Sequence, residues 1–220
     1  PYMNLGNGLF SDETARAGLA GSTWFYLGWA TRIGDFDNDG NNDIFVVNGH
    51  VYPEVDVAAL RTTYAQRNQV LWNDGGSKLV ERELLPQDGL SKIHSSRGAA
   101  FGDVDNDGDL DAIIVNIDDL PDVLRNEQQG ESNHWVSFAL VGERSNRNAI
   151  GARVTVTTGS CVLVGEVRPS GSYLSSNDLR VHFGLGVADH IDRVVVRWPN
   201  GRQEEIVDVA VDQIYWLRER

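Results

Sequence analysis

Two short segments of the chain place an aspartate at every second position and turn on a glycine. The first starts at Asp35 and reads Asp-Phe-Asp-Asn-Asp-Gly-Asn-Asn-Asp, and the second starts at Asp103 and reads Asp-Val-Asp-Asn-Asp-Gly-Asp-Leu-Asp. Calcium is a hard cation that takes six to eight oxygen ligands, and acids at alternate positions of a tight loop can converge on one point. The spacing therefore predicts a calcium site in each segment.

Each loop offers the same set of ligands. Carboxylates at positions 1, 3, 5 and 9 and the main-chain carbonyl at position 7 would bind the ion, and water would complete the shell. In the first loop these residues are Asp35, Asp37, Asp39, Asp43 and the carbonyl of Asn41; in the second they are Asp103, Asp105, Asp107, Asp111 and the carbonyl of Asp109. Gly40 and Gly108 occupy position 6, where the sharp turn is expected to need a positive φ.

Two other interpretations of these loops are weaker. In a solvated turn without a cation, the four carboxylates within nine residues would repel one another and raise one another's pKa. An EF-hand needs an acid at position 12 and a helix on each side, but position 12 is Val46 or Ile114, each inside an expected strand. The loops are therefore expected to hold structural calcium between strands rather than to act as a calcium sensor.

The two loops belong to an internal repeat. Three pairs of segments align: 28–40 with 96–108, 43–48 with 111–116, and 68–73 with 121–126. The offset is 68 residues for the first two pairs and shorter for the third, which places extra chain at residues 53–67. A repeat of roughly 40–70 residues with about four short strands is typical of a propeller blade.

The first blade is expected to be incomplete, because residues 4–19 resemble residues 73–90 and the chain would begin in the middle of a repeat. We therefore expect a C-terminal piece of a longer repeat protein. The apolar, β-branched runs at residues 44–47 and 112–115 predict buried strands. Residues 55–66 have weaker β character and could hold a short helix.

From about residue 133 the pattern changes to short segments that alternate apolar and polar residues. These are residues 134–141, 152–157, 162–167, 179–183, 193–198, 205–209 and 213–217. Such a series predicts a small β-sandwich or a barrel-like domain. The chain is thus expected to be all-β, with blades of a partial β-propeller over residues 1–131 and a second β domain over residues 132–220.

Charge divides the chain at the same point. Residues 1–131 contain 22 acidic and 9 basic residues, whereas residues 132–220 contain 10 of each, and the whole chain has a net charge of −13. An acidic surface repels nucleic acid and anionic membranes. No window approaches the ~18 continuous apolar residues of a membrane span. Neither nucleic acid nor a membrane span is therefore expected.

Other candidate residues are better explained by structure than by chemistry. The polar loops 145–148 and 171–177 could bind a ligand or a sugar, but Asn, Ser and Gly also satisfy the backbone of turns. His134 and His182 are expected to be packing residues, and Cys161 a small core residue. No Gly-x-Ser-x-Gly elbow and no His-x-x-x-His pair occurs in the sequence, so no catalytic activity is expected.

These motifs resemble known families. Ile33-Gly34 and Phe101-Gly102, each followed by an Asp loop, resemble FG-GAP repeats, also called VCBS repeats, over roughly residues 1–130. The rest of the chain resembles the ASPIC/UnbV domain through residues 133–135, 145–154, 171–177, 182–186 and 196–201. In this order the two parts are similar to the C-terminal end of the cartilage acidic protein family. The resemblance implies a calcium-binding, extracellular propeller followed by this domain.

Three functions are compatible with the sequence. The first is a binding, adhesion or scaffold module. It would be secreted, held at the cell surface or periplasmic, and its partner would be a protein, a glycan or the remaining blades of a longer parent chain. The second is the non-catalytic end of a carbohydrate-active enzyme, and the third is an accessory subunit of a larger surface assembly or filament. The first is preferred, because calcium sites of this kind suit the high calcium supply outside the cytoplasm.

Overall fold

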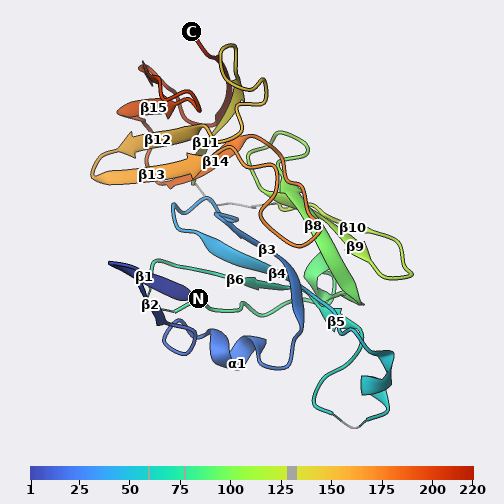
Figure 1. Ribbon diagram of the computed structural model, residues 1–220. Helices are drawn as coiled ribbons and strands as arrows, with labels where there is room; N and C mark the ends of the chain where they lie inside the picture. Colours follow the sequence, from blue (N-terminus) through green and yellow to red (C-terminus); the bar gives the residue numbers. More distant parts are fainter. Residues whose placement is uncertain (59, 77, 128–132) are drawn as a thin grey trace.

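The computed structural model describes residues 1–58, 60–76, 78–127 and 133–220, and these residues form mainly short β-strands (Figure 1). The predicted boundary between residues 131 and 132 lies outside the described residues. The strands on its two sides belong to separate sheets: β10 (Asp122–Leu124) ends the first part, and β11 (His134–Val141) begins the second. No helix among the described residues is long and apolar enough to cross a membrane.

The two repeats fold into two three-stranded antiparallel sheets. The first has the order β3 (Gly28–Gly34), β4 (Asp43–Asn48) and β6 (Gln69–Leu71). The second has the order β8 (Ser96–Gly102), β9 (Asp111–Asn116) and β10. The strands predicted at residues 44–47 and 112–115 are confirmed as the interiors of β4 and β9, and each Asp loop connects the first strand of its sheet to the second.

The similarity of the two sheets extends to their irregularities. The register of β3 against β4 shifts between Gly28 and Thr31, and that of β8 against β9 shifts between Ser96 and Ala99. Both shifts fall at equivalent positions of the predicted 68-residue offset, so both first strands carry the same β-bulge. The repeat is therefore a repeat of backbone geometry as well as of sequence.

The two sheets share one hydrophobic core. Its buried residues come from both blades and are Ala30, Phe36, Phe45, Val47, Val70, Ala99, Phe101, Leu110, Ala112 and Ile114. The ring centroids of Phe45 and Phe101 lie 5.1 Å apart, and Phe36 lies 5.7 Å from Phe45. Burying each such ring contributes about 1.5–3 kcal/mol. Because Phe36 and Leu110 belong to the Asp loops, the conformation of the loops is coupled to the packing of the blades.

The other elements of the first part are short. They are β1 (Tyr2–Gly6), β2 (Leu9–Asp12), β5 (Gln66–Arg67), β7 (Ile93–His94), the helix α1 (Leu19–Thr23) and 3-10 helices at Pro53–Asp56 and Gly89–Ser91. β1 pairs with β2, and β5 pairs with β7. The helix that the sequence suggested within residues 55–66 is reduced to the 3-10 turn ending at Asp56. The carboxylate of Asp56 accepts a hydrogen bond from the N–H of Tyr64 at 2.8 Å. This bond joins the two ends of the segment between these residues.

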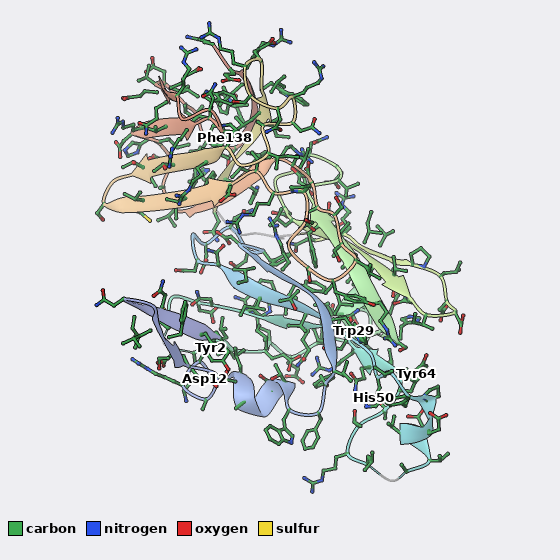
Figure 2. The ribbon with its side chains drawn as sticks, viewed as in Figure 1. Tyr2, Asp12, Trp29, His50, Tyr64 and Phe138 are labelled. Atoms are coloured by element: carbon green, nitrogen blue, oxygen red, sulfur yellow. The ribbon has the colours of Figure 1, made fainter. Side chains whose placement is uncertain are left out.

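The C-terminal strands form two sheets that enclose a second core (Figure 2). The further strands are β12 (Arg153–Thr158), β13 (Cys161–Glu166), β14 (Val181–Gly186), β15 (Arg193–Arg197), β16 (Gln203–Ile206) and β17 (Gln213–Arg218). One sheet has the order β14-β11-β17, with β17 parallel to β11, and the other has the order β13-β12-β15-β16. Phe138 and Trp198 are buried between them. The seven predicted strands are confirmed, although β14 begins later and β16 ends earlier than predicted.

Glu219 connects the C-terminal end of this domain to the loop that follows β11. Its Oε2 atom accepts hydrogen bonds from the backbone N–H groups of Glu143, Arg144 and Ser145 at 2.9, 2.8 and 2.7 Å, and Asn200 donates to Oε1. Burial would raise the pKa of Glu219, but these hydrogen bonds outweigh it and lower the pKa to about 2. The loop 145–148, considered above as a ligand-binding candidate, therefore has an observed structural role.

These hydrogen bonds of Glu219 predict that the substitution Glu219→Gln changes thermal stability in a way that depends on pH. A carboxylate whose pKa is lowered by folding stabilises the folded state at pH values above its ordinary pKa of 4.5. This stabilisation is lost as the pH falls toward 2. We expect the variant to melt several degrees below the unmodified chain at pH 7 and the difference to narrow at pH 3. Thermal unfolding followed by circular dichroism measures both, and a difference that stays constant with pH would contradict the assignment.

Candidate metal sites

The two Asp loops have the same backbone conformation. Asn38 and Asn106, at the fourth position, have φ angles of 58° and 64°, and Gly40 and Gly108 have φ angles of 89° and 96°. Asn is among the residues that tolerate this left-handed region, and Gly adopts it without a steric penalty. The predicted positive φ at both glycines is confirmed.

Backbone N–H groups fix the first aspartate of each loop in the same way. Asp35 accepts from the N–H of Asp39 at 3.1 Å and of Gly40 at 2.8 Å. Asp103 accepts from the equivalent N–H groups of Asp107 and Gly108, both at 3.2 Å. This arrangement turns each loop back on itself and brings the alternate carboxylates together.

Three carboxylates meet in each loop. One oxygen of each of Asp35, Asp37 and Asp39 lies within 4.8 Å of the others, and the same holds for Asp103, Asp105 and Asp107. Asp35 and Asp37 are buried, whereas Asp105 and Asp107 are exposed. The structure thus assembles three of the four predicted carboxylate ligands in each loop into a group that could hold a metal ion.

The fourth carboxylate of each loop has a structural role that the sequence did not reveal. Asp43 accepts from the N–H of Phe36 at 2.9 Å and from the N–H of Asn73 at 2.8 Å. Asp111 accepts from the equivalent N–H groups, those of Val104 at 2.8 Å and Asn126 at 2.9 Å. Each therefore ties the start of its loop to the residue just beyond the third strand of the sheet. The carbonyls of Asn41 and Asp109 stay predicted ligands.

The electrostatics of the first loop fit a bound cation. Burial raises the pKa of Asp35 to about 7; the Gly40 N–H opposes this rise, and the charges of Asp39, Asp37 and Asp43 add to it. The Oδ1 atom of Asp37 is buried and has no hydrogen-bond partner among the described residues. A divalent cation would satisfy this oxygen and relieve the repulsion.

Each loop also has an arginine in an ion pair with one of its carboxylates. Arg82 lies 2.9 Å from Asp37, and Arg125 lies 2.6 Å from Asp105. Both arginines follow the third strand of their sheet in the sequence. In the second loop the charge of Arg180 also acts on Asp103. Each group of three carboxylates still carries more negative charge than the nearby arginines supply, so the arginines compensate the loops only in part.

The first loop also contacts the second loop and the C-terminal domain through one residue. Asn38 donates from Nδ2 to the carbonyl of Gly108 at 3.1 Å and to Asp109 at 3.0 Å. Its Oδ1 atom lies 2.8 Å from Nε2 of His182, and its carbonyl accepts from the N–H of Gly186 at 2.8 Å. Asn38 therefore links both blades to β14.

The surroundings of His182 favour its neutral form. Burial, followed by the charges of Arg32 and Arg180, lowers its pKa to about 3. Because Asn38 offers an oxygen, Nε2 must carry the proton and donate, and Nδ1 then accepts from Ser137 at 3.0 Å. His182 is thus half-buried, and its ring stacks on that of Trp135, which agrees with the predicted packing role. It also positions the loop.

Two glycines permit the close approach of the domain to the loops. A side chain at Gly184 on β14 would lie 2.0 Å from the carboxylate of Asp35, and one at Gly108 would lie 2.0 Å from the ring of Trp135. Arg180 donates to Asn106 at 2.6 Å and also to the carbonyl of Asp103. Both Asp loops are therefore in contact with the C-terminal domain, although residues 104–107 of the second loop stay exposed.

The loop between β13 and β14 extends this contact along the edges of the blades. Ser175 accepts from the N–H of Ala99 at 3.0 Å, and Asn177 accepts from the N–H of Phe101 at 3.1 Å. The ring of Tyr173 lies 4.7 Å from that of Trp29. This is the loop considered above as a possible sugar-facing loop. Its Ser175 and Asn177 bind the backbone of β8 and cover an edge strand that would otherwise be unpaired, while Tyr173 packs on β3.

Two expectations about single residues are wrong. Cys161 is exposed rather than part of the core, because β13 is the edge strand of its sheet and Cys161 stands at its end, beside the hairpin turn. His134 is half-exposed, and its Nδ1 atom lies 2.7 Å from Asp212. It therefore makes a surface contact rather than a packing contact.

Comparison with known families agrees with this architecture. A model described as FG-GAP-like repeat matches residues 48–114, and a model described as ASPIC and UnbV matches residues 142–220. The chain is therefore an FG-GAP-like repeat protein with a C-terminal ASPIC/UnbV domain.

Its relatives include cartilage acidic protein 1 of three vertebrates. The Mus musculus protein is 32% identical over 172 residues, which cover 76% of this chain and 25% of the relative. The Homo sapiens protein is also 32% identical, with 24% of its length covered, and the Xenopus tropicalis protein is 28% identical over 171 residues. The chain thus spans about a quarter of the length of these relatives. The resemblance to the cartilage acidic protein family is confirmed.

The contacts of Asn38 predict that it matters more than its counterpart Asn106. Both have a positive φ, so replacement by Ala imposes the same backbone cost, but only Asn38 joins three parts of the chain. We expect Asn38→Ala to lower the free energy of unfolding by about 1–3 kcal/mol more than Asn106→Ala does, since it leaves buried partners unsatisfied. Urea unfolding at constant calcium measures the difference. Equal losses in the two variants would show that Asn38 has no special linking role.

Proposed function

We propose that this chain is a calcium-stabilised extracellular module that presents a rigid surface to a protein or glycan partner. The observation that carries the proposal is that both Asp loops lie at the junction of the blades and the C-terminal domain. An ion in such a loop would neutralise the repulsion exactly where the two parts meet. Calcium in this proposal stabilises the binding surface and takes no part in a reaction.

Calcium is the proposed metal because of the donors. Each loop offers carboxylates and main-chain carbonyls, which are hard oxygen ligands, and neither loop contains a cysteine or histidine. The proposed ligands are those predicted from the sequence. Asp43 and Asp111 can combine this role with their hydrogen bonds, because each carboxylate oxygen has two lone pairs.

An extracellular location fits these sites. Loops of this kind would be filled by the roughly 10⁻⁴–10⁻³ M calcium at which extracellular modules bind. The two families and the cartilage acidic protein relatives also support a binding or adhesion role rather than a catalytic one.

Calorimetry tests the metal assignment. Titration of calcium into the chelator-treated protein is expected to fit two sites, and about 1 mM calcium is expected to raise the melting temperature over that in excess EDTA. Asp37→Asn should remove one site and Asp105→Asn the other. Asp118→Asn, which replaces an aspartate outside the loops, is the matched control and should retain both. Equal melting temperatures with calcium and with EDTA would overturn the proposal.

A further inference from the structure

A cleft of about 320 Å³ lies between the outer edge of β3 and the strands β13 and β14. Its charged residues include four arginines, and we call it the arginine cleft. The arginines are Arg32, Arg153, Arg168 and Arg180, and the acidic residues of the lining are Asp35, Glu166 and Asp178. The cleft therefore combines residues from the first blade and the C-terminal domain.

Arg32 is the unusual member of this group. It lies on β3, and its Nε atom is buried without a hydrogen-bond partner. Among the described residues no carboxylate lies within ion-pair distance of its guanidinium, although the charge of Asp178 acts on it from farther away. Burial lowers the pKa of Arg32, yet a guanidinium stays protonated in proteins. A partly buried cation without a partner is costly and favours an anion at this place.

The other charges of the cleft leave an excess of positive charge. Arg180 pairs with Asp178, and Arg168 lies 2.8 Å from Glu166. Arg153, exposed on β12, has no ion pair within the described residues. Arg32 and Arg153 are thus two cations outside any ion pair among the described residues, although the charges of Asp178 and Glu166 act on them from farther away. They lie in one cleft of a chain whose net charge is −13.

Asp35 is a third acidic residue that lines the cleft, beside Glu166 and Asp178. Its two carboxylate oxygens accept the loop N–H groups of Asp39 and Gly40. In the proposed calcium-bound state its charge would be shared with the ion. A cleft with positive charge and low-dielectric walls concentrates anions from solution.

We propose that the arginine cleft binds the carboxylate or sulfate group of an acidic sugar residue. Guanidinium groups bind such planar or tetrahedral oxyanions through paired N–H donors. Glu166 and Asp178 offer acceptors for neighbouring hydroxyl groups, and the volume lies at the lower end of the about 300–1,000 Å³ of small-molecule sites. The proposal rests on the module binding an external partner, and it identifies one chemical class of that partner.

Isothermal titration with simple probes tests this site. D-glucuronate, sodium sulfate and D-glucose are titrated separately into the calcium-saturated chain at constant ionic strength. We expect D-glucuronate or sulfate to bind and D-glucose not to bind. Binding of glucuronate identifies the carboxylate as the recognised group, and binding of sulfate alone identifies the sulfate ester.

Substitutions then locate the binding. Arg32→Gln and Arg153→Gln are each expected to raise the dissociation constant of the anion at least about tenfold. This is the loss expected when one charge-assisted hydrogen bond is removed. Arg144→Gln makes the same change of charge at an exposed arginine that does not line the cleft. This variant should bind the anion as tightly as the unmodified chain does. If Arg32→Gln fails to fold, the exposed Arg153 carries the test.

The result separates this inference from the proposed function. A chain that binds two calcium ions but neither anion would overturn the arginine cleft and leave the calcium proposal intact. Anion binding that survives in both cleft variants, or D-glucose binding as tight as that of glucuronate, would also overturn it.

Discussion

The repulsion among the clustered carboxylates at the junction is the interaction on which the arrangement of this chain depends. Asp35 and Asp37 are buried next to Asp39, and one nearby arginine, Arg82, compensates them only in part. The repulsion raises the pKa of Asp35 further than burial alone would. The loop nevertheless places Phe36 in the core shared by the blades. Whatever neutralises these acids therefore stabilises the blade core as well as the loop.

The C-terminal domain uses the same loops as its docking surface. Asn38 joins the second loop, His182 and Gly186, and Gly184 allows β14 to approach the carboxylate of Asp35. The β13–β14 loop then extends the contact by hydrogen bonding to the edge of β8. The proposed metal site, the packing of the blades and the docking of the C-terminal domain are thus coupled, because all three depend on one short stretch of backbone.

The sequence predicted the features whose causes are local. The spacing of the aspartates predicted the loops and the positive φ of Gly40 and Gly108, since ligand spacing and turn geometry are set within nine residues. Apolar runs predicted β4 and β9, and the alternation of apolar and polar residues predicted the strands of the C-terminal domain. The contact between Asn38 and His182 spans 144 residues, and no local pattern marks it. The exposure of Cys161 likewise depends on β13 being an edge strand, which follows from the sheet order and not from its apolar sequence.

Amide hydrogen exchange with and without calcium tests most directly the claim that the metal loops hold the two parts together. The N–H groups of Gly186, Ala99 and Phe101 make contacts between the blades and the C-terminal domain, whereas that of Val154 lies inside the sheet of the C-terminal domain. The account predicts that chelation accelerates exchange at the first three amides and leaves Val154 protected. Equal protection of the junction amides in calcium and in EDTA would contradict it.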